Sequence, residues 1–156
     1  MTPECLRALE LMLDGDRTLT FGEPEESIMK YLEALRHAEE APESDSFFDK
    51  DLMIACCNSG LSTAYRRKGM FVESLASADR AVGILDHTFD SRRGVDTERL
   101  VEAAMSKTLS LAGLGRSVEA LMAVEYTKAI LQTSGRWNTH VEETLEHLAL
   151  QLKAKS

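Results

Sequence analysis

Four histidines and three cysteines are the side chains of this 156-residue chain best suited to acid–base, nucleophilic or metal chemistry. His140, Glu143 and His147 are spaced one and two helical turns apart, in a line that loosely resembles a metal site. A zinc site needs three or four converging ligands, however, and no cysteine is near these residues in sequence. We therefore predict no metal site. The histidines are His37, His87, His140 and His147.

The cysteines and glycines do not form a catalytic motif either. Cys5, Cys56 and Cys57 are odd in number, two are adjacent, and no CxxC is present, so we expect buried, reduced thiols. A vicinal redox or metal role for Cys56 and Cys57 is the alternative. P-loop, GxGxxG, HExxH and GxSxG patterns are all absent. We predict no catalytic residue and no cofactor, and an enzyme or metal protein remains only a third hypothesis.

Charge and hydropathy exclude further classes. The chain has 18 basic and 26 acidic residues and a net charge of −8, whereas nucleic-acid binders need a positive surface. The longest apolar run is Leu52–Cys57, far shorter than the about 20 residues of a membrane span. The first residues lack the basic and apolar regions of a signal peptide. We expect a cytoplasmic protein that binds neither nucleic acid nor membrane.

The elements that must position any site are helices. Apolar residues recur every three or four positions nearly throughout, and no stretch alternates with period two, which predicts an all-α fold. Thr2 with Pro3, and Pro24 with the acids around it, are typical of helix starts. We predict one domain, residues 1–156, with helices over about 3–20, 24–41, 47–68, 71–87, 96–114, 117–133 and 138–154.

An internal repeat appears when the chain is aligned on three glycines. Gly22, Gly69 and Gly115 are 47 and 46 residues apart. Each precedes an acid, a small residue and a branched aliphatic at fixed offsets, which predicts a helix hairpin used three times. The repeats cover about 3–41, 47–87 and 96–133. The aligned positions are Glu26, Glu73 and Glu119; Ser27, Ser74 and Ala120; Ile28, Leu75 and Leu121; Tyr31, Ala78 and Val124; Ala34, Ala81 and Thr127.

This pattern resembles the tetratricopeptide repeat. The second repeat carries the clearest match: Leu61-Ser62-Thr63-Ala64-Tyr65, then Gly69-Met70-Phe71-Val72-Glu73-Ser74-Leu75, then Ala81. The family repeat is about 34 residues, and the extra length here falls in 42–51 and 87–96. The resemblance implies a right-handed superhelix of three hairpins, as in small stand-alone prokaryotic proteins of this class without assigned function.

The last segment, about 138–154, is predicted to cap the superhelix. Its apolar stripe would cover the open face of the third hairpin, and its other side is polar, as the end of a solenoid requires. The alternative is that the stripe binds a second copy and makes a homodimer. The stripe comprises Val141, Leu145, Leu148 and Leu152.

The resemblance also implies a function, that of a protein-interaction module. The first helices of the hairpins would line a concave groove, mostly apolar, that binds a peptide or helix of a partner protein. Arg66 is the single basic residue among the inferred groove positions, which disfavours the carboxylate clamp of co-chaperone domains. The alternative is that these residues pack on the protein's own core or last helix. The candidate groove residues are Met12, Asp16, Ser59, Thr63, Arg66, Glu102, Met105 and Leu109.

Two small basic clusters remain, Arg66-Arg67-Lys68 and Arg92-Arg93. Either can mark an acidic ligand. The first also fits the C-terminus of a helix, where positive charge is favoured, and we prefer that interpretation.

Overall fold

The computed structural model describes residues 1–43, 49–86, 94–135 and 139–155. These stretches contain seven α-helices and no strand, which confirms the predicted all-α class. Each observed boundary lies within three residues of its prediction. The helices are α1 (Pro3–Phe21), α2 (Pro24–Glu40), α3 (Lys50–Arg67), α4 (Phe71–Asp86), α5 (Gly94–Gly113), α6 (Ser117–Thr133) and α7 (Thr139–Lys155).

Local chemistry explains where the first three helices begin. Thr2 accepts a hydrogen bond from the backbone N–H of Cys5 at 3.3 Å, with Pro3 in the first turn. Asp49 caps α3 by accepting from the N–H of Leu52 at 3.0 Å. Pro24 opens α2 without a side-chain cap, and acids occupy its first turn, near the positive end of the helix dipole.

The aligned glycines end their helices in two different ways. Gly69 and Gly115 both have φ +74°, and the residue after each bonds back to a carbonyl five residues earlier, as in a Schellman motif. Both positions therefore favour glycine. Gly22 instead has φ −131° and ψ −155°, an extended conformation open to any residue. Gly22 thus shares the spacing of the other two glycines but not their backbone conformation.

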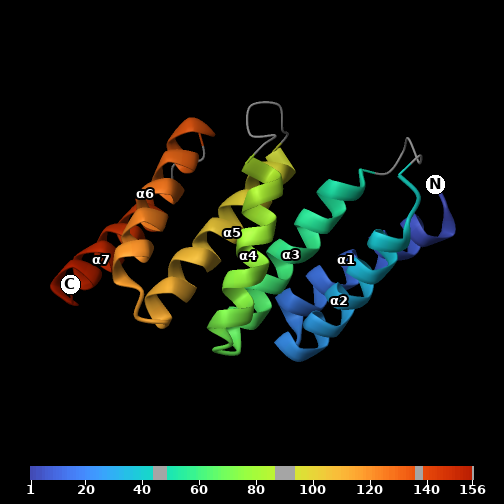
Figure 1. The fold of residues 1–156 in the computed structure, drawn as a ribbon, viewed down its shortest axis with the longest axis horizontal. Helices are drawn as coiled ribbons and strands as arrows, with labels where there is room; N and C mark the ends of the chain where they lie inside the picture. The colour runs from blue at the N-terminus through green and yellow to red at the C-terminus, as the bar shows by residue number, and fades with distance from the viewer. Residues whose placement is uncertain (44–48, 87–93, 136–138, 156) are drawn as a thin grey trace.

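The helices follow one another along the long axis of the molecule, with the termini at opposite ends (Figure 1). Each helix packs against the next in the chain, and α3 also contacts both α1 and α5. In the described stretches, no helix is both long enough and apolar enough for a membrane span.

Burial follows the repeat alignment closely. The positions five, nine and twelve residues after the aligned glycines are fully buried in all three segments. The spacing seen in the sequence is therefore also the spacing of buried positions along the chain. The nine residues are Ser27, Ser74, Ala120, Tyr31, Ala78, Val124, Ala34, Ala81 and Thr127.

Tyr31 fills the junction of α1, α2 and α3, and two glycines make room for it. A Cβ added to Gly60 of α3 would lie 2.3 Å from Cζ of Tyr31, and one added to Gly15 of α1 would lie 2.9 Å from its ring. Real side chains do not tolerate such distances, so the ring packs directly against the backbone of both helices.

Hydroxyl groups hold the junction of α3, α4 and α5. Ser74 donates to the carbonyl of Ser62 at 2.7 Å and accepts from Ser110 at 2.8 Å, and all three residues are buried. Between α5 and α6, the hydroxyls of Thr108 and Thr127 lie 3.4 Å apart. Small polar residues thus bring these helices close while satisfying their own hydrogen bonds.

The C-terminal helix packs on the chain itself. Leu145 and Leu152 are buried against residues of α5 and α6, and Val141 and Leu148 are half-buried there. On the opposite side of α7, Leu150 is 67% exposed.

Candidate functional site

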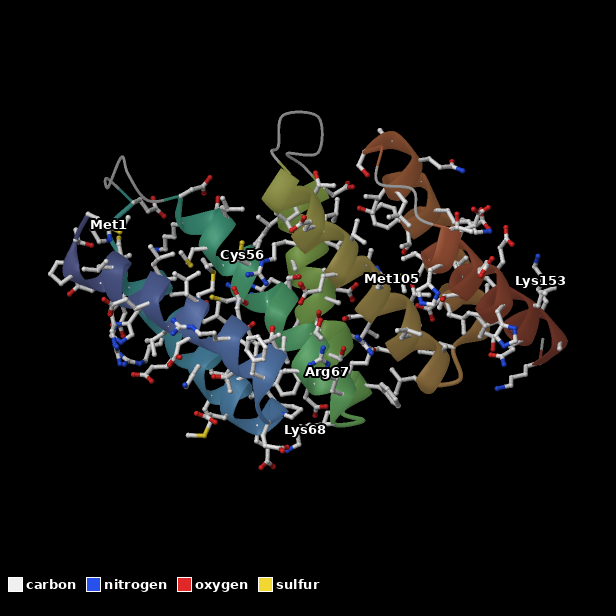
Figure 2. All side chains as sticks on the ribbon, turned by 180° about the vertical axis from the view of Figure 1, so that it is seen from behind. Met1, Cys56, Arg67, Lys68, Met105 and Lys153 are labelled. Atoms are coloured by element: carbon white, nitrogen blue, oxygen red, sulfur yellow. The ribbon has the colours of Figure 1, made fainter. Side chains whose placement is uncertain are left out.

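A pocket of about 470 Å³ opens between α1, α3 and α5. In Figure 2, Arg67 lies at the end of α3 beside α1, and Met105 lies on α5. The sequence predicted a mostly apolar surface here, but six of the ten lining side chains are charged. The lining consists of Asp16, Leu19, Thr20, Thr63, Arg66, Arg67, Glu98, Arg99, Glu102 and Met105.

The structure brings together five of the eight predicted groove residues: Asp16, Thr63, Arg66, Glu102 and Met105. The other three lie elsewhere. Met12 is 8% exposed and packs in the N-terminal core. Ser59 is fully buried, with its hydroxyl bonded to the carbonyl of Arg99 at 2.8 Å, and Leu109 is half-buried outside the pocket.

The predicted groove residues did not include five residues of the lining, Leu19, Thr20, Arg67, Glu98 and Arg99, although Arg67 belongs to a basic cluster noted in the sequence. The signal for two of them was present, because stepping back one helical turn from Glu102 reaches Glu98 and Arg99. Arg67 adjoins Arg66 but lies outside the spacing of groove positions along α3. Its guanidinium reaches the pocket by donating to the carbonyl of Leu19 on α1, at 2.7 Å.

An ion-pair network crosses the floor of the pocket. The hydroxyl of Tyr31 donates to Oδ1 of Asp16 at 2.5 Å, and Nη2 of Arg99 donates to Oδ2 of the same carboxylate at 2.5 Å. Arg99 also lies 3.7 Å from Glu102, which accepts from the hydroxyl of Thr63 at 2.9 Å. The network therefore ties α1, α2, α3 and α5 together.

Burial sets the electrostatics of this network. Burial opposes the positive charge of Arg99, but the hydrogen bond to Asp16 and the attraction of the charges on Asp16 and Glu102 together outweigh that effect and leave the pKa of Arg99 raised. Burial raises the pKa of Glu102, with the charge of Arg99 acting in the opposite direction. Burial and then the hydrogen bond to Asp16 raise the pKa of Tyr31. Asp16 and Arg99 thus form a charged pair with a neutral phenol attached.

The histidines and cysteines lie away from the pocket. His37 lies on α2, His140 and His147 lie exposed on α7, and His87 falls outside the described residues. No group of three His, Cys, Asp or Glu side chains in the described stretches is placed to hold a metal ion. All three cysteines are buried, as predicted, and none forms a disulfide. Burial, with a smaller contribution from Cys56, raises the pKa of the Cys57 thiol to about 12, so it stays protonated.

A second, smaller pocket of about 310 Å³ lies between α5 and α6. Lys107 in its lining pairs with Asp79 of α4 at 2.8 Å, and Tyr126 donates to Asp86 of α4 at 2.6 Å. These polar groups are paired with the chain itself.

Comparison with known proteins agrees with this architecture. A family described as a domain of unknown function, DUF3856, matches residues 4–139. No curated protein matches the chain. The crystal structure of a TPR-like protein from Chlorobium tepidum TLS superposes with a TM-score of 0.81 at 25% identity, over 97% of this chain and 95% of that one. The fold is therefore tetratricopeptide-like.

Proposed function

Since the chain belongs to the DUF3856 family and has a tetratricopeptide-like fold, we propose that it is a non-enzymatic protein-interaction module. In this proposal residues 1–156 form one domain. The pairs α1/α2, α3/α4 and α5/α6 are three hairpins of a right-handed superhelix, and α7 is its cap. A segment of a partner protein binds in the pocket between α1, α3 and α5.

One observation carries the proposal: the pocket is open, and three helices far apart in sequence supply its lining. Repeat proteins bind their ligands on such shared surfaces, because stacking aligns equivalent helices side by side. The lining pairs charged groups with Met105, a flexible apolar side chain that adapts to different partners. Met105 also packs against the cluster of buried residues from α6 and α7.

A steric block tests the site. Thr20 is exposed at the pocket rim, and its hydroxyl bonds back to the carbonyl of Asp16 within α1. A displayed library of random 12-residue peptides is selected against the full chain, and Thr20→Trp is expected to weaken the selected peptides at least about tenfold, or about 1.4 kcal/mol. Thr144→Trp is the matched control, because Thr144 has the same back-bond, to His140, on exposed α7.

Two results would contradict the proposal. One is that no peptide is selected above background. The other is that Thr20→Trp and Thr144→Trp act equally, which would place binding elsewhere. Circular dichroism of each variant checks that the helices remain folded.

A second candidate, self-association through α7, has one observation in its favour, the exposed Leu150. Light scattering at two protein concentrations tests it. A dimer that Leu150→Asp converts to monomer supports the idea, and a strict monomer excludes it.

A further inference from the structure

Two arginines in the pocket lack a carboxylate partner. In the described part of the chain, neither Arg66 nor Arg67 forms an ion pair. Arg67 uses one nitrogen to donate to Leu19, and Arg66 makes a single long contact, 3.5 Å from its Nε to the hydroxyl of Ser106. The terminal nitrogens of Arg66 therefore keep their donors for a group from outside the chain.

The carboxylates of the same pocket are already engaged. Asp16 accepts from Tyr31 and Arg99, and Glu102 accepts from Thr63 and lies beside Arg99. Arg99 thus forms ion pairs with both carboxylates. Arg66 and Arg67 lie next to each other in the chain and carry the same charge. Burial first, and then repulsion by Arg67, lowers the pKa of Arg66, while the charge of Glu102 acts in the opposite direction.

The third member of the basic cluster behaves differently. Lys68 forms an ion pair with Glu25 of α2, outside the pocket lining. Favourable charge at the C-terminus of α3 accounts for all three residues equally, but it does not explain why two of them line a pocket in which, within the described residues, neither forms a direct ion pair.

We propose that the pocket binds the side-chain carboxylate of an aspartate or glutamate in the partner segment, held between Arg66 and Arg67. This inference rests on the proposed function and specifies the partner's chemistry. The planar fork of a guanidinium matches a carboxylate with two parallel hydrogen bonds. A partner residue next to the acid would contact Met105.

The balance of charge favours a carboxylate over a phosphate. The pocket lining contains three arginines and three acids, so its formal charge is zero. One carboxylate adds a single negative charge beside Glu98 and Glu102, whereas a phosphate adds nearly two. Repulsion from the acidic side chains of the pocket is therefore stronger for a phosphate than for a carboxylate.

The same random-peptide selection tests the inference. We expect selected peptides to contain Asp or Glu at a fixed position more often than the starting library. Arg66→Gln with Arg67→Gln should weaken the best acidic peptide at least about tenfold, and amidation of its acid should cost about the same. When the variant with both glutamines is tested against the amidated peptide, the affinity should fall little further than with either change alone, because both changes remove the same contact.

Matched controls separate this site from general charge. Arg7→Gln with Arg80→Gln removes the same charge from arginines paired with exposed glutamates and should leave affinity unchanged. Arg66→Lys keeps the positive charge but loses the forked guanidinium. Its affinity for the acidic peptide should lie between that of the wild type and that of Arg66→Gln.

The outcomes distinguish the two proposals. Peptides that Thr20→Trp blocks, but that show no acid preference or no response to Arg66→Gln with Arg67→Gln, overturn the carboxylate site and leave the interaction module standing. Selection of phosphorylated over acidic synthetic peptides also overturns it. Absence of any peptide blocked by Thr20→Trp overturns both.

Discussion

The junction around Tyr31, where α1, α2 and α3 meet, and the junction around Ser74, where α3, α4 and α5 meet, are packed in different ways. At the first, a large ring is accommodated by removing side chains from the neighbouring helices at Gly15 and Gly60. At the second, small residues meet through hydroxyl hydrogen bonds. Helices of this chain therefore approach one another by two different means, a ring packed on bare backbone and small side chains joined by hydrogen bonds.

The two junctions should respond differently to change. The first depends on shape, so adding a single carbon atom should be costly. The second depends on hydrogen bonds of ordinary strength, so losing one should be tolerated. The free energies of unfolding of variants at each junction test this contrast.

The largest effect is expected for Gly60→Ala. Glycine to alanine inside a helix usually stabilises by about 1 kcal/mol, but here the new Cβ would collide with Tyr31. We expect the free energy of unfolding, measured by urea denaturation, to fall by about 3 kcal/mol, as it does when a protein core is overpacked. Combined with Tyr31→Leu, Gly60→Ala should cost less than the two single changes added together.

Gly83→Ala is the matched control for that change. Gly83 also lies in a helix, α4, but a Cβ there would meet nothing within 4 Å. It should stabilise the protein by about 1 kcal/mol. If both alanines act alike, the Tyr31 junction is not limited by shape.

Tyr31→Phe should have the next largest effect. It removes a hydrogen bond to a charged acceptor, Asp16, which is worth about 2 kcal/mol. The raised pKa of Tyr31 adds a pH dependence: above its ordinary value of about 10, the unfolded chain loses the phenolic proton while the folded chain keeps it. Wild-type stability should therefore fall with rising pH more steeply than that of the variant.

The measurement is urea unfolding of both proteins at pH 8 and at about pH 11. The difference in free energy of unfolding between wild type and Tyr31→Phe should be smaller at the higher pH. A constant gap would mean that the tyrosine keeps an ordinary pKa in the folded protein.

The smallest loss is expected for Ser74→Ala. It removes one hydrogen bond to Ser62 and one from Ser110, and the methyl group fits the space. We expect the two losses together to lower the free energy of unfolding by about 1.5 kcal/mol, read as a lower midpoint in urea unfolding at unchanged slope. Thr144→Ala on exposed α7 should change nothing measurable. A loss at Ser74 as large as that at Gly60 would erase the contrast between the junctions.

Helical periodicity and cap residues were sufficient to predict the helices, since both depend on neighbours in sequence. The aligned positions were also predicted well, because Tyr31, Ala78 and Val124 are all fully buried. The carboxylate network was not predicted. Asp16 and Arg99 are 83 residues apart, and nothing local signals that they meet.

Five of the eight predicted groove residues line one pocket, and three do not. Met12 is buried in the N-terminal core, and Ser59 is buried where its hydroxyl donates to the carbonyl of Arg99 on α5. Arg67 was missed because a long side chain reaches beyond the face on which its backbone lies.

The ion pair between Asp16 and Arg99 has a consequence for how the molecule opens. In an array held by nearest-neighbour contacts, an end unit detaches at the cost of a single interface. Here the first helix is also bonded to the fifth, so detaching it leaves Arg99 half-buried without its main counter-ion. Fraying at the N-terminus is thereby coupled to the centre of the array, and amide hydrogen exchange in α1 should track that in α5.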